Sequence, residues 1–217
     1  MGSEPNARLR GRASLTACAA ALSLLATGLA VGNWQAARGA TLTVTNCNDS
    51  GPGSLRAAVA AAALSGDVIT FALSPSCSVI TLTTGEIAID KSVTITGPGA
   101  RALAVSGNHA SRVFEIDATV AISGLTIEDG VSDSGGGIAV NDTLTLTDSV
   151  VTANSATCTT SGGNCFAQGG GISNVGTTTV VRSTISANAV SCTATGGFCT
   201  ALGGGIADEP PPASICS

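Results

Sequence analysis

The tetrapeptide GGGI occurs three times in this chain, and successive copies are 34 residues apart. The copies begin at Gly135, Gly169 and Gly203. The same step separates further matched pairs: Asn154/Asn188, Cys158/Cys192, Cys165/Cys199, Leu146/Val180 and Val151/Ile185. A fixed period built from short apolar segments indicates a repeat architecture, in which each unit buries its apolar face only by stacking on its neighbour.

The composition favours many narrow strands joined by tight turns. Of the 217 residues, 44% are apolar, whereas aromatic residues make up 2% and charged residues 11%. Much of the remainder is Gly, Thr and Ser, which argues against a helical bundle. The net charge is −5, and the few Lys and Arg residues after Arg38 are scattered, so we expect no nucleic-acid partner.

The N-terminal segment predicts export. Arginines within residues 8–12 precede an uncharged apolar run over residues 13–32, and small residues follow as far as Gly39. This pattern predicts a signal peptide over residues 1–39 and a secreted or cell-surface protein with no membrane span after cleavage. The alternatives are cleavage after Gly32 and an uncleaved anchor, since about 20 apolar residues can cross a bilayer.

The segment 40–78 predicts an N-terminal cap made of a strand, a helix and a second strand. The helix has Ser54 at its N-cap and a narrow apolar stripe, and we expect Gly66 to end it. Because the first coil of a solenoid exposes its core, such a helix serves as a lid.

Residues 79–207 predict the coils of a parallel β-helix. Apolar bursts of three to five residues end in Gly, Asn, Asp or Pro-Gly, and no long helix fits between them. Without crossover helices, successive short strands form a parallel sheet only by winding round a common axis. One turn takes about 24 residues, and about ten more form a cysteine-bearing loop. Residues 208–217 leave the pattern, and we expect an irregular, truncated tail.

The repeated Asn and Gly residues predict a structural corner. Asn154 and Asn188 should stack along the axis as a ladder of hydrogen-bonded amides. The glycines at positions 135, 169 and 203 suit a corner that needs positive φ. They lack the following Lys and helix of a phosphate-binding loop.

Seven cysteines follow the predicted leader, and export predicts that they form disulfides with one left over, Cys216. The disulfide candidates are Cys47, Cys77, Cys158, Cys165, Cys192 and Cys199. The first two bracket the cap. The last four form two C-x6-C units, which could pair within each loop or between loops on neighbouring rungs. A four-thiolate zinc site is less favoured, because structural zinc uses closer pairs.

Several segments resemble a known family. KSVTITGPGARALAVSGNHASRVFEI, SGGGIAV and LTLTDSVVTANSA resemble bacterial secreted right-handed parallel β-helix repeat proteins of the pectin-lyase-like superfamily. The GGGI and [VI]-x-x-N elements are similar to the GGAI and FxxN repeats of chlamydial polymorphic outer membrane proteins, with Val151 and Ile185 in place of Phe. TLTVTNCNDSGPGSLRAAVAAA resembles the N-terminal cap of such proteins. The resemblance spans about residues 41–207 and implies an all-β, right-handed parallel β-helix with a short capping helix.

The superfamily includes enzymes as well as adhesive stalks. Its lyases use a basic residue and Ca²⁺-binding carboxylates, and its hydrolases use carboxylates on consecutive turns. The candidate acids here are Glu115, Asp117, Glu128, Asp129, Asp133, Asp142 and Asp148, and the candidate bases are Arg101, Arg112 and Arg182. Among these acids only Glu128 and Asp129 are adjacent, at a strand end where solvated turns carry charge. Asp148 and Arg182 align one repeat apart as a surface ion pair.

Other catalytic and sugar-binding signals are weak. His109 lies in the turn GNHAS without the flanking glycines of the hydrolases' GHG motif, and we expect it to be exposed. Sugar binding recruits Trp or Tyr, but the chain has no Tyr, and Trp34 lies in or near the leader. We expect the four phenylalanines to pack in the core or in loops.

We therefore expect an exported, non-catalytic β-helix repeat protein with an adhesive or structural role at or outside the cell surface. Its expected partners are surface glycans or proteins of host or neighbouring cells. We expect no catalytic residue, cofactor or metal site, and Ca²⁺ enters only under a lyase alternative. The alternatives are a polysaccharide lyase or glycoside hydrolase fragment and a carbohydrate-binding module.

Overall fold

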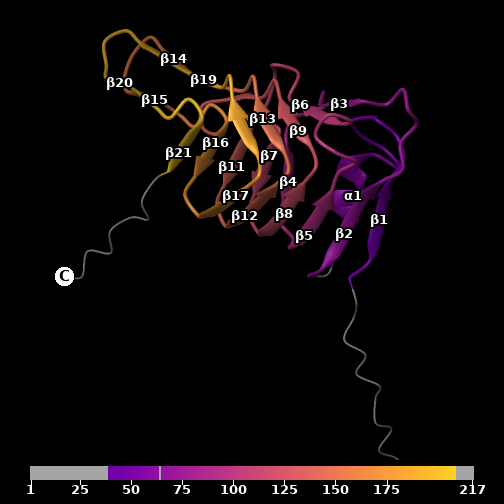
Figure 1. Ribbon diagram of the computed structural model, residues 1–217. Helices are drawn as coiled ribbons and strands as arrows, with labels where there is room; N and C mark the ends of the chain where they lie inside the picture. The colour runs from indigo at the N-terminus through magenta and orange to yellow at the C-terminus, as the bar shows by residue number, and fades with distance from the viewer. Residues whose placement is uncertain (1–38, 64, 209–217) are drawn as a thin grey trace, which may run out of the picture. The chain divides into compact units, whose positions relative to one another are not determined.

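The computed structural model describes residues 39–63 and 65–208, which Figure 1 shows as a series of short strands. The predicted signal peptide and tail rest on residues 1–38 and 209–217, outside the described part. Within the described ranges, no helix is long and apolar enough to cross a membrane.

The described strands pair in parallel throughout and form five sheets, named A to E here. Sheet A contains β1 (Thr41–Val44), β2 (Asp67–Phe71), β5 (Val93–Thr96), β8 (Thr119–Ser123), β12 (Thr143–Thr147) and β17 (Thr177–Val181). Sheet B contains β3 (Val79–Thr81), β6 (Ala104–Ser106), β9 (Thr126–Glu128), β13 (Val150–Thr152) and β18 (Thr184–Ser186). Sheet C contains β4 (Ile87–Ile89), β7 (Phe114–Ile116), β11 (Ile138–Val140), β16 (Ile172–Asn174) and β21 (Ile206–Asp208). Sheet D contains β10 (Val131–Ser132), β14 (Ser155–Thr160) and β19 (Ala189–Ala194), and sheet E contains β15 (Cys165–Gln168) and β20 (Cys199–Leu202).

From β2 onward the chain passes through sheets A, B and C in turn and returns to sheet A beside its previous strand. The register in sheet A aligns Asp67, Val93, Val120, Leu144 and Thr178, so the four coils between them span 26, 27, 24 and 34 residues. The longest coil carries β14 and β15, which hold the cysteine-bearing loop. This all-β, all-parallel arrangement is compatible with a parallel β-solenoid.

The core consists of stacked columns of aliphatic side chains. In sheet A, Ile69, Ile95, Ile122 and Leu146 align strand by strand, and each is at most 1% exposed. The alternation of the sequence explains this, because every second residue of a strand points to the same face. Burying each such side chain stabilises the fold by about 1.5 to 3 kcal/mol relative to an exposed one.

Helix α1 (Leu55–Ala61) lies between β1 and β2, where later coils have strands of sheets B and C. Ser54 caps it, since its extended backbone allows the hydroxyl oxygen to accept from the backbone N–H of Ala57 at 3.1 Å. The helix buries Leu55 and Val59 and contacts β1 and β4.

The expectation that Gly66 ends this helix is wrong, because the helix stops at Ala61 and Ala62 has an extended backbone. Asp67 supplies the reason. One of its carboxylate oxygens accepts from the backbone N–H of Ala63 at 2.8 Å, and the other accepts from Ala40. These bonds satisfy amides outside the helix and turn the chain toward β2.

A single carboxylate ties this N-terminal region to the first coil. Asp49 Oδ2 accepts hydrogen bonds from the backbone N–H and the hydroxyl of both Thr83 and Thr84. Its Oδ1 accepts from the guanidinium of Arg56 on α1, which also donates to the carbonyl oxygens of Gly85 and Glu86. Helix α1 is therefore fixed to the turn before β4.

Candidate functional site

The structure places the repeated glycines and asparagines at corners of the coils. The first glycine of each GGGI has positive φ, of 64° at Gly135 and 59° at both Gly169 and Gly203. A Cβ on Gly135 would lie 2.3 Å from the carbonyl oxygen of Ile138, so the turn also leaves no room for a side chain. These residues form turns and hydrogen-bonded contacts within the fold.

The predicted disulfides are confirmed, and the structure resolves their pairing. Cys47 bonds to Cys77. The two loop units pair internally, as Cys158 with Cys165 and Cys192 with Cys199. In register, Cys158 lies opposite Cys192 and Cys165 opposite Cys199, so the two disulfides occupy neighbouring coils.

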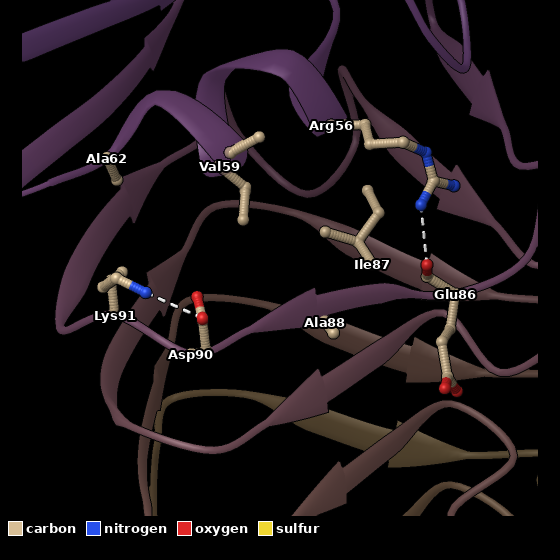
Figure 2. Close-up of a pocket in the computed structure, with 9 residues that line it drawn as sticks. Arg56, Val59, Ala62, Glu86, Ile87, Ala88, Asp90 and Lys91 are labelled. Atoms are coloured by element: carbon tan, nitrogen blue, oxygen red, sulfur yellow. Dashed lines mark hydrogen bonds and ion pairs between the residues drawn. The ribbon is translucent and has the colours of Figure 1, made fainter.

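A cavity of about 510 Å³ lies between α1 and β4 (Figure 2). Its lining is Arg56, Val59, Ala60, Ala62, Glu86, Ile87, Ala88, Asp90 and Lys91. Both cations of the lining already have protein partners. Lys91 Nζ donates to Asp90 Oδ2 at 2.7 Å, and Arg56 holds Asp49. An anionic ligand would have to displace these partners.

Next to this cavity, Arg112 joins two carboxylates of neighbouring coils. Its Nη1 lies 3.1 Å from Glu86 Oε2 and 3.5 Å from Glu115 Oε1. Its Nε donates to the carbonyl oxygens of Ser134 and Gly135, and its Nη2 donates again to Ser134. The guanidinium is thus saturated with acceptors and only 12% exposed. An arginine whose nitrogens are all engaged in this way holds the two coils together.

Glu86 has a raised pKa. Burial raises the pKa of Glu86, and the nearby carboxylates of Glu115 and Asp117 add to the rise, which outweighs the opposing charge of Arg112. A raised pKa is what a general acid requires. However, Arg112 forms ion pairs with both Glu86 and Glu115. A substrate could contact either carboxylate only beside the guanidinium of Arg112.

A second cluster surrounds the turn after β6. His109, whose side chain is 72% exposed as the sequence predicts, has Nε2 3.7 Å from Asp129 Oδ1. Ser106 Oγ donates to Asp129 Oδ2 at 3.4 Å. Ser, His and Asp therefore meet, but the serine contacts the carboxylate instead of the imidazole. Nucleophilic catalysis needs a base that receives the hydroxyl proton, so this arrangement does not form a catalytic triad.

Most of the remaining sequence candidates lie apart. Asp148 and Arg182 form the predicted exposed ion pair, with two hydrogen bonds of 2.7 Å. The pKa of Asp148 falls because of its hydrogen bonds to Arg182. Burial, with the adjacent charge of Asp129, raises the pKa of Glu128. Asp117 lies near the cluster of Glu86 and Arg112, since its charge contributes to the raised pKa of Glu86. Asp133 accepts from the hydroxyl of Ser132, Asp142 accepts from that of Thr143, and Arg101 is exposed.

Two phenylalanines contradict the expectation that all four pack in the core or in loops. Phe114 is fully buried and Phe71 packs against the core. Phe166 and Phe198 are 61% and 81% exposed. Both lie on the extension formed by β14, β15, β19 and β20, which carries two disulfides. Each of these two phenylalanines is next to a disulfide cysteine in the sequence. The surface of this extension is thus partly aromatic.

The chain was compared with protein-family models, curated proteins and solved structures, and no match was found.

The sequence did not point to Glu86 or Asp49 as members of clusters. Glu86 meets Arg112 only through the pairing of β4 with β7, and the coils there lack the 34-residue step. The backbone N–H and hydroxyl groups of Thr83 and Thr84 converge on Asp49 because the disulfide-braced cap folds back on the first coil. No local sequence motif predicts either contact.

Proposed function

We propose that the chain is an exported, non-catalytic, right-handed parallel β-helix of the pectin-lyase-like type with an adhesive role at or outside the cell surface. Three disulfides among the described residues favour an oxidising compartment. The parallel register of successive coils favours the β-helix.

The observation that carries the adhesive role is the exposure of Phe166 and Phe198 on the disulfide-braced extension. Strands β14, β15, β19 and β20 extend beyond sheets A, B and C (Figure 1). Disulfides at Cys165 and Cys199 fix the backbone next to each aromatic ring. Exposed aromatic side chains on a rigid backbone offer contact area at low entropic cost. Surface glycans or proteins of host or neighbouring cells fit this surface.

A binding assay tests this role. Beads coated with the full exported chain are incubated with a glycan panel and with intact cells, and retention is measured. We expect the double variant Phe166→Ser/Phe198→Ser to lose retention. Val79→Ser is the matched control, because Val79 is a 41% exposed apolar residue of β3, far from the extension in sequence. Equal retention by the double variant, or no retention by the native protein, would contradict the adhesive role.

One observation favours the lyase or hydrolase alternative. Glu86, whose pKa is raised by burial, lies near Glu115, and glycoside hydrolysis uses a pair of carboxyl groups. The ion pairs of Arg112 with both groups count against this alternative.

A carbohydrate-binding module without catalysis would use the same exposed phenylalanines. The glycan arm of the binding assay distinguishes it from protein adhesion.

A further inference from the structure

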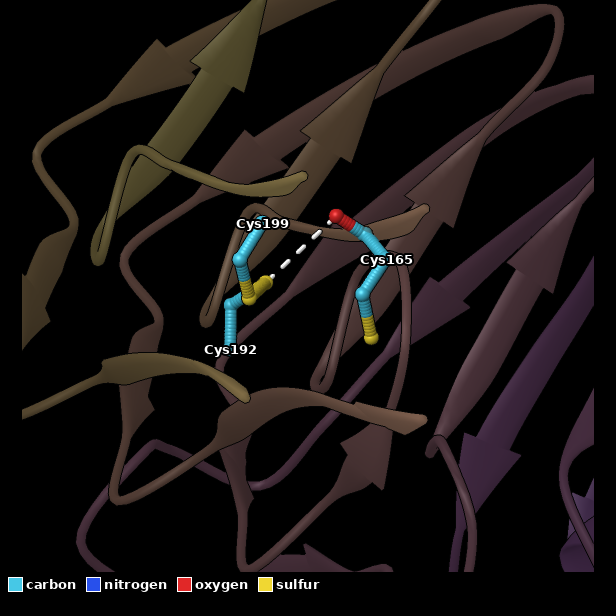
Figure 3. A group of neighbouring side chains, drawn as sticks. All are labelled: Cys165, Cys192 and Cys199. Carbon is cyan, nitrogen blue, oxygen red and sulfur yellow. Dashed lines mark hydrogen bonds between the residues drawn. A yellow bond between two sulfur atoms is a disulfide. The ribbon is translucent and has the colours of Figure 1, made fainter. Parts of the chain in front are cut away.

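The two disulfides of the extension bring sulfur atoms from neighbouring coils together. The Sγ atoms of Cys165, Cys192 and Cys199 all lie within 4.8 Å of one another, although Cys165 belongs to a different disulfide from the other two (Figure 3). Cys158 Sγ is bonded to Cys165 Sγ, so the fourth sulfur borders the same group. Within the described ranges, these residues form the one group of three or more potential metal ligands.

These sulfur positions are close to those of a tetrahedral thiolate site. With Zn–S bonds of about 2.3 Å, the sulfurs of such a site lie about 3.8 Å apart. Cys165 Sγ must therefore approach the sulfurs of Cys192 and Cys199 by about 1 Å at most. Cys158 Sγ, which lies outside this group of three, must move further, and the sulfurs within each disulfide must separate after reduction. Rotation about side-chain bonds provides movements of this size. The long C-x6-C spacing is no obstacle, because the ligands come together across coils and not along one loop.

We propose that reduction of both disulfides converts Cys158, Cys165, Cys192 and Cys199 into a four-thiolate site for a soft, thiolate-preferring cation such as Zn²⁺. Each disulfide takes two electrons from one phosphine molecule, which becomes a phosphine oxide with oxygen from water, and yields two thiols. Binding of one Zn²⁺ then forms four Zn–S bonds and releases the four thiol protons. The oxidised extension is a braced surface, and the reduced extension is a metal-binding one.

The rest of the fold should survive this reduction. The large cluster of buried apolar side chains contains no residue of β14, β15, β19 or β20, although Ala156, Cys165 and Ala167 of these strands are themselves buried. Cys199 is exposed whereas Cys165 is 1% exposed, so a reductant reaches the Cys192–Cys199 disulfide first. Reduction also opens the Cys47–Cys77 disulfide, but Asp49 and its donors still hold the cap.

Metal titration of the full exported chain tests the proposal. The protein is reduced with a phosphine, and the reductant is then removed under anaerobic conditions. The reduced protein is titrated with Co²⁺ as a spectroscopic probe and afterwards with Zn²⁺. We expect one Co²⁺ per chain, the visible absorption of a tetrahedral thiolate complex, and its loss on addition of one equivalent of Zn²⁺. Circular dichroism should show that the strands persist. The oxidised protein should not give this spectrum.

Variants locate the site. Cys165→Ser should abolish the tetrathiolate spectrum, whereas Cys47→Ser, which removes a thiol of the cap, should retain it. A variant with serine at all four loop positions keeps the remaining cysteines of the chain and should bind no Co²⁺. The proposal is overturned if the reduced, folded protein gives no such spectrum, or if Cys165→Ser keeps it. A reduced chain that loses its strand signal and does not regain it with Zn²⁺ also overturns it.

Discussion

Asn154 donates a hydrogen bond from its side-chain Nδ2 to Oδ1 of Asn188, one repeat later, at 3.0 Å. The same oxygen of Asn188 accepts from the backbone N–H of Asn154. Oδ1 of Asn154 in turn accepts from the backbone N–H of Gly130 on the preceding coil at 2.8 Å. One buried side chain therefore connects three successive coils.

Replacing Asn154 with Ala should lower the free energy of unfolding by about 2 to 3 kcal/mol, because it leaves buried backbone groups without partners. Among these is the N–H of Gly130. Urea unfolding followed by circular dichroism measures the effect. Asn141→Ala is the control, since that exposed side chain donates to Asp117 at the surface. Equal losses in the two variants would show that the corner amide has no special role.

Gly136 should not tolerate a side chain. A Cβ there would lie 2.4 Å from the carbonyl oxygen of Ser155 and 2.6 Å from that of Gly170, so Gly136→Ala should destabilise the fold by about 1 to 3 kcal/mol. Gly162→Ala is the matched control, because no atom lies within 4 Å of its Cβ position and its φ is ordinary. Thermal unfolding of both variants distinguishes a steric cause from a general effect of losing glycine.

The bonds to Asp49 predict acid sensitivity of the cap. Burial alone would raise the pKa of Asp49, but hydrogen bonds from Thr84, Arg56 and Thr83 outweigh it and hold the pKa well below its ordinary value of 3.8. A lowered pKa in the folded state means that this stabilisation is fully present above pH 3.8 and is lost as the pH falls further. Asp49→Asn should therefore reduce stability at pH 7.

The difference in stability between the native protein and Asp49→Asn should stay constant from pH 7 to about pH 5 and shrink below the ordinary pKa. Unfolding in urea at a series of pH values measures it. Asp133→Asn, which removes the same charge from an exposed turn, should change little across this range. A constant difference down to pH 2 would contradict the role assigned to the Asp49 carboxylate.

Two arginines of similar appearance in the sequence should differ in importance. Arg112→Met should cost about 2 to 4 kcal/mol, since it leaves Glu86 and backbone carbonyls without their donor. Arg182→Met removes an exposed ion pair with Asp148 and should have a small, salt-dependent effect. Unfolding at low and high salt compares them, and a larger loss for Arg182→Met would refute this ranking.

The sequence predicts the fold best where its period is regular. The 34-residue step aligns Leu146 with Val180 and Val151 with Ile185, and the strand register places the same residues side by side. Alternation of apolar residues also predicts which side chains are buried. The earlier coils are 26, 27 and 24 residues long, so no single step aligns them.

The contacts that define the candidate site depend on that irregular register. Glu86 and Arg112 meet across coils of unequal length, and neither belongs to a repeated motif. The exposure of Phe198 also escapes sequence patterns, because an apolar residue beside a disulfide cysteine can equally well pack against it. The end of α1 depends on Asp67, six residues after the last helical residue, whose carboxylate accepts from the amide of Ala63.

The claim that the protein is non-catalytic is tested most directly by glycan cleavage. The folded protein is incubated with pectin, alginate and related polysaccharides, with and without Ca²⁺, while unsaturated and reducing ends are measured. We predict no release above that of a heat-unfolded sample. Sustained cleavage would contradict the account, and its loss in Glu86→Gln would assign the activity to the carboxyl cluster around Arg112.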